Sequence, residues 1–256
     1  MQAQAQTPTA YTSLKPFVDF FATGRPMLVY HKLGARPKKV RIKGLYLSAP
    51  LFQRQMEELH AGGYSTPAYA ELPAKANGAK DITLTFDDGF ASAFNHALKP
   101  LAQHGFRAIQ FLVADRIGGF NEWEVLQGEA REPLMDESQI KEWIGAGHEI
   151  GAHSLTHPYL TRISLREARE QIFSCKKKLE DRFGVAVRHF CYPYGDWNPA
   201  VRDLVMRAGY ETACTIDFGV NTAATPAFEL RRITARYQSV SIKALKARLG
   251  RFMKKK

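Results

Sequence analysis

The sequence alternates between short apolar segments and amphipathic ones, and this alternation limits the fold more than any other feature. The longest amphipathic segment spans 164–183, where Ser164 and Glu167 form a capping box and Gly184 supplies a stop signal. Repeated strand–helix units without a long low-complexity linker predict one α/β domain with a parallel sheet or barrel. Segments typical of buried strands lie at 26–30, 82–86, 108–113, 148–150, 186–191 and 212–216.

The length and composition agree with one large globular domain. The chain has 256 residues, of which 45% are hydrophobic and 24% charged, so global disorder is excluded. Three cysteines cannot form a disulfide framework, and no apolar run approaches the length of a membrane span. We expect a polar tail over 1–14 and a single domain over 15–256 that ends in a basic helix. The first residues lack the pattern of a signal peptide, so we expect a cytoplasmic or membrane-peripheral protein unless a leader has been lost.

The chain is strongly basic, with 36 Lys and Arg against 25 Asp and Glu and a formal net charge of +11. Seven of these cations lie within 243–256. No nucleic-acid-binding module accompanies them, so we expect no nucleic-acid partner. The excess favours attraction to an anionic membrane surface or polymer. Polar stretches at 36–43, 118–133 and 218–228 are expected to be loops around a site.

Ionisable residues follow two of the predicted strands, at the end where α/β barrels place their functional groups. Asp87 and Asp88 come directly after the strand 82–86. Two adjacent carboxylates repel each other unless a cation neutralises one or each has its own partner. Asp-Gly is also common turn chemistry, and that structural interpretation stays open.

The second cluster is His153 and His157, after the strand 148–150. Two histidines four residues apart can converge on one metal ion, although such spacing also arises by chance. One aspartate and two histidines would leave a coordination position open, as in a catalytic metal site, and the other aspartate could act as general base. The residues alone do not decide which of Asp87 and Asp88 has which role.

A third element, 191–197, combines a Pro-Tyr-Gly turn with further aromatic residues. Such a turn can present a backbone N–H to a developing oxyanion. Tyr192, Pro193 and Trp197 are candidates for contact with a sugar ring. The alternative is an aromatic turn that only packs the mouth of the barrel.

These three elements together resemble the polysaccharide deacetylases, also called the NodB-homology or carbohydrate esterase family 4 enzymes. The resemblance lies in TFDDG at 85–89, HSLTHP at 153–158 and YPYGDW at 192–197. It implies a distorted (β/α)7-type barrel that hydrolyses N-acetyl groups of amino sugars with a divalent metal, zinc being the first expectation. By position it implies that Asp87 is the general base and that Asp88, His153 and His157 hold the metal. It also implies that the backbone N–H of Tyr194 helps to form the oxyanion hole.

The sequence departs from the family pattern at two places. Cys191 stands where the family has an arginine that steadies the base, and no histidine follows His189 to supply the usual general acid. Both departures resemble the branch of poly-N-acetylglucosamine deacetylases. That resemblance implies His31, after the strand 26–30, as general acid and Arg232 as the residue that steadies Asp87.

The substrate class follows from the same resemblance. We expect an N-acetylated polysaccharide or oligosaccharide. A first alternative is a glycolipid or lipid-linked sugar at a membrane surface, because apolar and basic residues alternate helically over 242–256. A second alternative is an inactive carbohydrate-binding relative, which the intact Asp-Asp, His-His and Pro-Tyr-Gly set disfavours.

Overall fold

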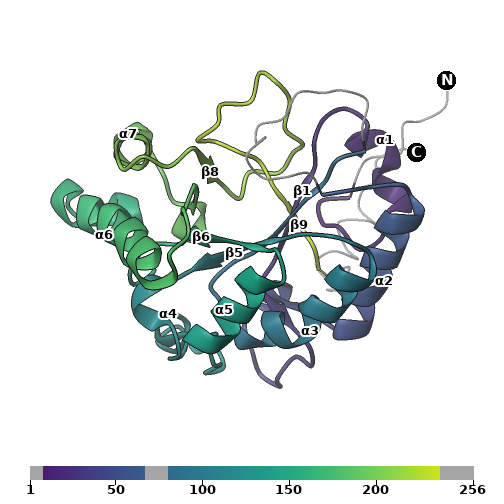
Figure 1. Cartoon of the computed structure of the whole chain (residues 1–256), viewed down its shortest axis with the longest axis horizontal. Helices are drawn as coiled ribbons and strands as arrows, with labels where there is room; N and C mark the ends of the chain where they lie inside the picture. Colours follow the sequence, from purple (N-terminus) through teal and green to yellow (C-terminus); the bar gives the residue numbers. More distant parts are fainter. Residues whose placement is uncertain (1–7, 67–79, 237–256) are drawn as a thin grey trace, which may run out of the picture.

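A curled, all-parallel sheet of seven strands forms the centre of the computed structural model, which describes residues 8–66 and 80–236 (Figure 1). The strand order β8-β7-β6-β5-β4-β1-β9 gives the half-barrel of a distorted (β/α)7 fold, as expected. A separate parallel pair, β2 (Lys32–Leu33) and β3 (Tyr46–Leu47), lies outside this sheet. The seven strands are β1 (Met27–Tyr30), β4 (Thr83–Phe86), β5 (Ile109–Leu112), β6 (Glu149–Ala152), β7 (His189–Cys191), β8 (Thr212–Cys214) and β9 (Ile233–Thr234).

Helices follow the strands and cover the outside of the curled sheet (Figure 1). The capping box of Ser164 and Glu167 forms in full, and Gly184 ends that helix in the left-handed conformation at φ 68°. The helices are α1 (Val18–Phe21), α2 (Ala49–Ala61), α3 (Ala91–Gln103), α4 (Glu122–Val125), α5 (Glu137–Gly145), α6 (Leu165–Phe183) and α7 (Pro199–Arg207). Short 3-10 turns occupy Lys15–Phe17, Lys43–Leu45, Ala114–Arg116, Leu160–Arg162 and Pro193–Gly195.

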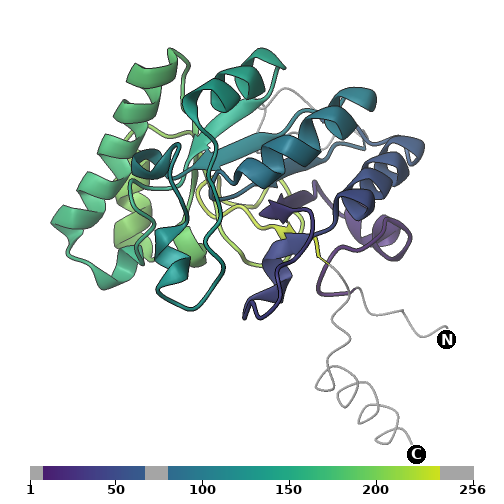
Figure 2. The ribbon, with the colours of Figure 1, turned by 90° about the horizontal axis from the view of Figure 1, so that it is seen from below.

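Two of the three stretches expected to be loops contain short elements of their own. The stretch 118–133 includes α4, and 36–43 ends in the 3-10 turn Lys43–Leu45. Both project from the same edge of the molecule, the lower edge in Figure 2. The basic helix expected over 241–256 lies outside the described residues. Among the described helices, none combines the length and the apolar character needed to cross a bilayer.

Segment 230–235 closes the barrel, and the sequence did not reveal it as a strand. At one end Leu230 forms a parallel bridge with Cys214 of β8. At the other end Ile233 pairs with Leu28 of β1. Tyr11, which forms a parallel bridge with Ala235, is fully buried in the core. The predicted polar tail over 1–14 is therefore too long, because its later residues pack against the closing segment.

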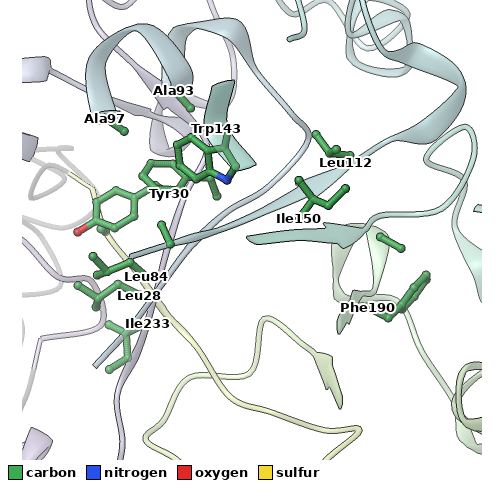
Figure 3. Packing of buried hydrophobic residues seen from close by; sticks show 14 of the residues in the cluster. Leu28, Tyr30, Leu84, Ala93, Ala97, Leu112, Trp143, Ile150, Phe190 and Ile233 are labelled. Carbon is green, nitrogen blue, oxygen red and sulfur yellow. The ribbon is translucent and has the colours of Figure 1, made fainter. Parts of the chain in front are cut away.

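The core consists of apolar side chains from the strands and from the helices that cover them (Figure 3). Leu28, Leu84 and Phe190 are completely buried. Trp143 of α5 packs edge-on against Phe86, with ring centroids 5.7 Å apart, and its indole N–H donates a hydrogen bond to the Glu149 carbonyl. Burial of each such side chain contributes about 1.5–3 kcal/mol to the free energy of unfolding. The well-packed sheet therefore holds the residues at its carboxyl edge in fixed positions.

His148, just before β6, makes the stability of this core depend on pH. Its side chain is 5% exposed, Nδ1 accepts a hydrogen bond from the Ala108 N–H, and the ring packs on Trp143. Burial, aided by the charge of Arg107, lowers the pKa of His148 to about 4. The unfolded chain, with a histidine pKa of about 6.5, binds the proton first as the pH falls. We therefore expect His148 to remove about 2–3 kcal/mol of stability between pH 6.5 and pH 4.

Urea unfolding at several pH values measures this loss. In His148→Asn, whose amide oxygen can accept the same hydrogen bond but does not titrate, the free energy of unfolding should fall less steeply over that range. Equal pH slopes for the two proteins would contradict the assignment.

Candidate active site

The carboxyl ends of four strands, and the residue that precedes a fifth, bring together the side chains that the sequence singled out. His31 follows β1, the two aspartates follow β4, the two histidines follow β6 and the Pro-Tyr-Gly turn follows β7. Arg232 directly precedes β9. All of them reach one region at the mouth of the barrel, where loops rather than regular elements carry the functional groups.

Asp88, His153 and His157 form a compact triad. The Asp88 Oδ1 lies 3.4 Å from His153 Nε2 and 3.2 Å from His157 Nε2, and the two Nε2 atoms are 3.2 Å apart. All three residues are at most 5% exposed. Ligand atoms about 2.0–2.1 Å from one tetrahedral ion lie about 3.3 Å from each other, so the three spacings fit a single such cation.

Contacts behind the triad orient it for that role. The Cys191 carbonyl lies 2.7 Å from His153 Nδ1, an arrangement that leaves Nε2 of the neutral ring free as a ligand. Burial alone would raise the pKa of Asp88, but when the two histidines carry a proton on Nε2 their hydrogen bonds to the carboxylate hold it well below its usual range. The carboxylate is thus kept ionised, which is the form that binds a metal.

Asp87 is paired with Arg232 instead. The guanidinium donates two parallel hydrogen bonds to the carboxylate, Nη1 to Oδ1 at 2.7 Å and Nη2 to Oδ2 at 2.8 Å. Both residues are buried, Arg232 with 1% and Asp87 with 3% of its surface exposed. Burial favours the neutral acid, yet the charge and hydrogen bonds of Arg232 lower the pKa of Asp87 below its ordinary value.

The small side chain of Cys191 leaves room for the guanidinium group of Arg232. Its Sγ lies 3.0 Å from Arg232 Nη2 and 3.5 Å from Asp87 Oδ2. Burial raises the pKa of this thiol to about 11, so it stays neutral beside the carboxylate. A longer cationic side chain at position 191 would compete with Arg232 for Asp87.

His31 approaches Asp87 from the open side of the site. Its Nε2 lies 3.8 Å from Asp87 Oδ2, and its side chain is 18% exposed, more than the other ionisable groups here. Burial lowers the pKa of His31, while the nearby carboxylates of Asp87 and Asp88 oppose that effect. The imidazole is therefore within reach of a molecule that also contacts Asp87.

The Pro-Tyr-Gly turn is held in an uncommon backbone conformation. Tyr194 has φ 60°, and Gly195 follows at φ 68° with Ile216 so close that a side chain at position 195 would clash with it. Asp88, Ser154 and His157 also have positive φ. In the described part of the chain five non-glycine residues have positive φ, and four of them surround this one site. Such strain concentrates where a fold positions functional groups.

The expected sugar contacts of the same motif need correction. Tyr192 is fully buried and donates its hydroxyl proton to the Phe228 carbonyl, and the side chain of Pro193 is buried too. Neither side chain can stack on a sugar, because both serve the packing of the turn. Trp197 is half-buried against Tyr192, with ring centroids 6.0 Å apart, and keeps an accessible part.

Sequence reasoning missed an aromatic lining around His157. Trp123 of α4 stacks on the His157 ring at a centroid distance of 4.8 Å, and Tyr194 contacts the same ring at 4.4 Å. Behind Trp123, the buried Lys32 Nζ lies 2.6 Å from Glu124 Oε2 and joins β2 to α4. The available signal for this contact was Lys32, which lies within the mainly apolar run 27–33. A lysine buried in such a run requires an acidic partner, and here the partner belongs to the helix that carries Trp123.

A parallel α/β barrel with ionisable side chains gathered at its carboxyl edge has the architecture of a barrel enzyme, because such enzymes carry their active sites at that edge. The chain belongs to the polysaccharide deacetylase family, whose family model matches residues 74–213. It is accordingly an enzyme of a family that hydrolyses the amide bond of N-acetyl groups on carbohydrates.

Curated relatives and solved structures agree with this family. A putative polysaccharide deacetylase, YxkH of Bacillus subtilis, is 24% identical over 81% of this chain and 70% of its own length. The peptidoglycan-N-acetylglucosamine deacetylase PgdA of Listeria monocytogenes is 28% identical over 73% of this chain, which spans only 36% of that protein. The fold is shared with the deacetylase PplD of Streptococcus pyogenes, at TM-score 0.71, 21% identity and 88% and 97% coverage of the two chains. IcaB from Ammonifex degensii gives a TM-score of 0.72 at 22% identity, with 88% and 96% coverage.

Proposed function

We propose that this protein is a metal-dependent hydrolase that removes N-acetyl groups from N-acetylated amino sugars in a polysaccharide or oligosaccharide. The observation that carries the proposal is the division of labour between the two aspartates. Asp88 faces two histidines at metal-ligand spacing, and Asp87 faces a buried arginine. The relatives named for peptidoglycan and chitooligosaccharide deacetylation support the substrate class.

Asp88, His153 and His157 would hold a divalent cation, for which zinc suits the mixture of imidazole and carboxylate ligands. When bound, the cation supplies Lewis-acid polarisation of the acetyl carbonyl and of water. The remaining steps belong to side chains and backbone. Asp87, kept ionised and fixed by Arg232, removes a proton from the attacking water.

The later steps use the Pro-Tyr-Gly turn and His31. The backbone N–H of Tyr194 stabilises the negative oxygen of the tetrahedral intermediate, because the strained turn holds this group at the mouth of the barrel. His31 donates a proton to the departing amine. Trp197 contributes an apolar surface for the sugar ring. The lipid-linked substrate would draw on residues 241–256, which lie outside the described residues.

Removing one triad ligand should weaken metal binding while the protein remains folded. We expect His157→Ala to weaken zinc binding at least about 100-fold, measured by calorimetric titration of the chelator-treated protein with zinc. Acetate release from N-acetylglucosamine oligosaccharides should disappear with the metal and return on its addition to the wild type. His96→Ala, at an exposed histidine of α3, is the matched control. Unchanged zinc affinity in His157→Ala, or full activity after chelation, would contradict the proposal.

A further inference from the structure

A strongly basic loop lies beside the proposed active site, and nothing in the proposed chemistry uses it. The loop 36–43 carries five exposed cations and no acidic residue: Arg36, Lys38, Lys39, Arg41 and Lys43. Within residues 8–66 and 80–236, none of the five forms an ion pair. Arg236 adds a sixth cation, since its guanidinium lies against Gly44 and its Nε is buried without a partner in the described part of the chain.

This cluster of unpaired cations differs from the lysines of α6, which have acidic partners. On α6, Lys176 pairs with Glu180, Lys177 with Asp181 and Lys178 with Asp115. Five like charges within eight residues repel one another, and this arrangement carries a cost in stability when no anion is bound. The loop therefore resembles a surface organised for an external anion more than a solvated face.

Hydrogen bonds fix the loop relative to the catalytic groups. Glu129, buried in the neighbouring loop, accepts hydrogen bonds from the backbone N–H groups of Arg41 and Ile42 at 3.0 and 2.8 Å. The Arg41 side chain donates to the Gln127 carbonyl at 2.8 Å. The Gln127 side chain in turn lies 3.4 Å from the Tyr194 hydroxyl. Two residue contacts thus connect the basic loop to the turn proposed to hold the oxyanion.

We propose that this loop binds phosphate groups carried by the sugar substrate itself, so that the enzyme prefers a phosphate-bearing N-acetylated glycan to a neutral one. The inference rests on the proposed function and specifies its substrate. Phosphate suits the site because several cations can share one multivalent anion, and guanidinium groups bind it through paired hydrogen bonds. Because the loop is fixed relative to Tyr194, it can bind a phosphate that lies at a constant distance from the acetylated sugar.

A membrane surface is the competing partner, and the loop itself argues against it. Residues 36–39 are charged apart from Pro37, and Val40 is turned inward and only 6% exposed. Ile42 is 45% exposed but stands between the cations Arg41 and Lys43. A loop that enters a bilayer interface carries apolar side chains at its tip. The adjacent Leu126, 91% exposed at the end of α4, is the side chain that a membrane would contact, and it provides a separate variant for the test.

The test compares two matched substrates: the N-acetylglucosamine trimer and the same trimer with a diphosphate at its reducing end. We expect the wild type to show a kcat/KM at least about tenfold higher for the diphosphate trimer, with the difference carried by KM and weakened by salt. The double variant Arg36→Glu/Lys38→Glu should lose this preference and keep its activity on the neutral trimer. Lys99→Glu/Arg207→Glu makes the same change in charge at exposed positions of α3 and α7 and should behave like the wild type.

Equal kcat/KM for the two trimers in the wild type, or a preference that survives in Arg36→Glu/Lys38→Glu, would overturn the inference. Co-sedimentation with phosphatidylglycerol vesicles that both this double variant and Leu126→Asp abolish, with no preference between trimers, would assign the loop to a membrane instead. Failure of the proposed function would appear separately, as no acetate from either trimer. Calorimetric titration of the wild type with both trimers then still decides whether the diphosphate binds at the loop.

Discussion

Asp87→Asn is expected to lower the rate of acetate release by about 10²–10⁴-fold, the usual contribution of a positioned general base. The amide has nearly the same volume as the carboxylate and can still accept a hydrogen bond from Arg232, but it cannot remove a proton from water. Because Asp87 lies outside the triad of Asp88, His153 and His157, zinc affinity should stay close to that of the wild type. The measurement is steady-state acetate release together with a zinc titration of the same preparation.

Two further variants make that result specific. Asp88→Asn should lose zinc affinity as well as activity, which separates the ligand from the base. Asp115→Asn, at an aspartate paired with Lys178 on the surface, should keep both. If folded Asp87→Asn retains full activity, or if Asp87→Asn and not Asp88→Asn loses zinc, the proposed roles of the two aspartates are wrong.

Arg232→Met should have the largest effect on stability. It leaves the Asp87 carboxylate buried without its cation, and removing one partner of a buried pair costs about 3–5 kcal/mol. The loss should appear as a lower urea midpoint at pH 7 and should shrink at lower pH, where Asp87 becomes protonated. Activity should fall as well, because the base loses the group that orients it.

The double variant Asp87→Asn/Arg232→Met tests whether the cost comes from the unpaired charge. It should recover much of the lost stability while remaining inactive, since both charges are gone. Arg202→Met is the control, because Arg202 pairs with Asp203 and Glu229 near the surface, where such pairs contribute about 0–1 kcal/mol. Equal losses for Arg202→Met and Arg232→Met would show that the burial of the pair is unimportant.

The sequence was informative wherever a local pattern has a direct physical cause. Apolar runs and caps placed most strands and helices within a few residues, because hydrophobic periodicity and hydrogen-bond capping act locally. The grouping of one of the two aspartates with His153 and His157 also followed, since parallel strands present their carboxyl ends at one edge. The choice between Asp87 and Asp88 came from family resemblance alone.

What could not be predicted depends on contacts between distant segments. The two-residue strand β9 has no periodicity to detect, and the stacking of Trp123 on His157 requires the loop 118–133 to fold back over β6. Tyr192 was misjudged because an aromatic residue in a motif looks the same whether it faces the substrate or the core. Its burial is a property of the completed barrel.

The closing segment 230–235 also links folding to activity. It joins β8 to β1, and the pairing of Ile233 with Leu28 connects residues about 200 positions apart in the chain. Contacts of such separation form slowly. Arg232 belongs to this segment, so a chain in which the ring is still open holds Asp87 without its cation. In that state the carboxyl group is a weaker acid and its orientation is not fixed. A molecule in which the two ends of the sheet are not yet joined would therefore be inactive, and deacetylation would begin only after they pair.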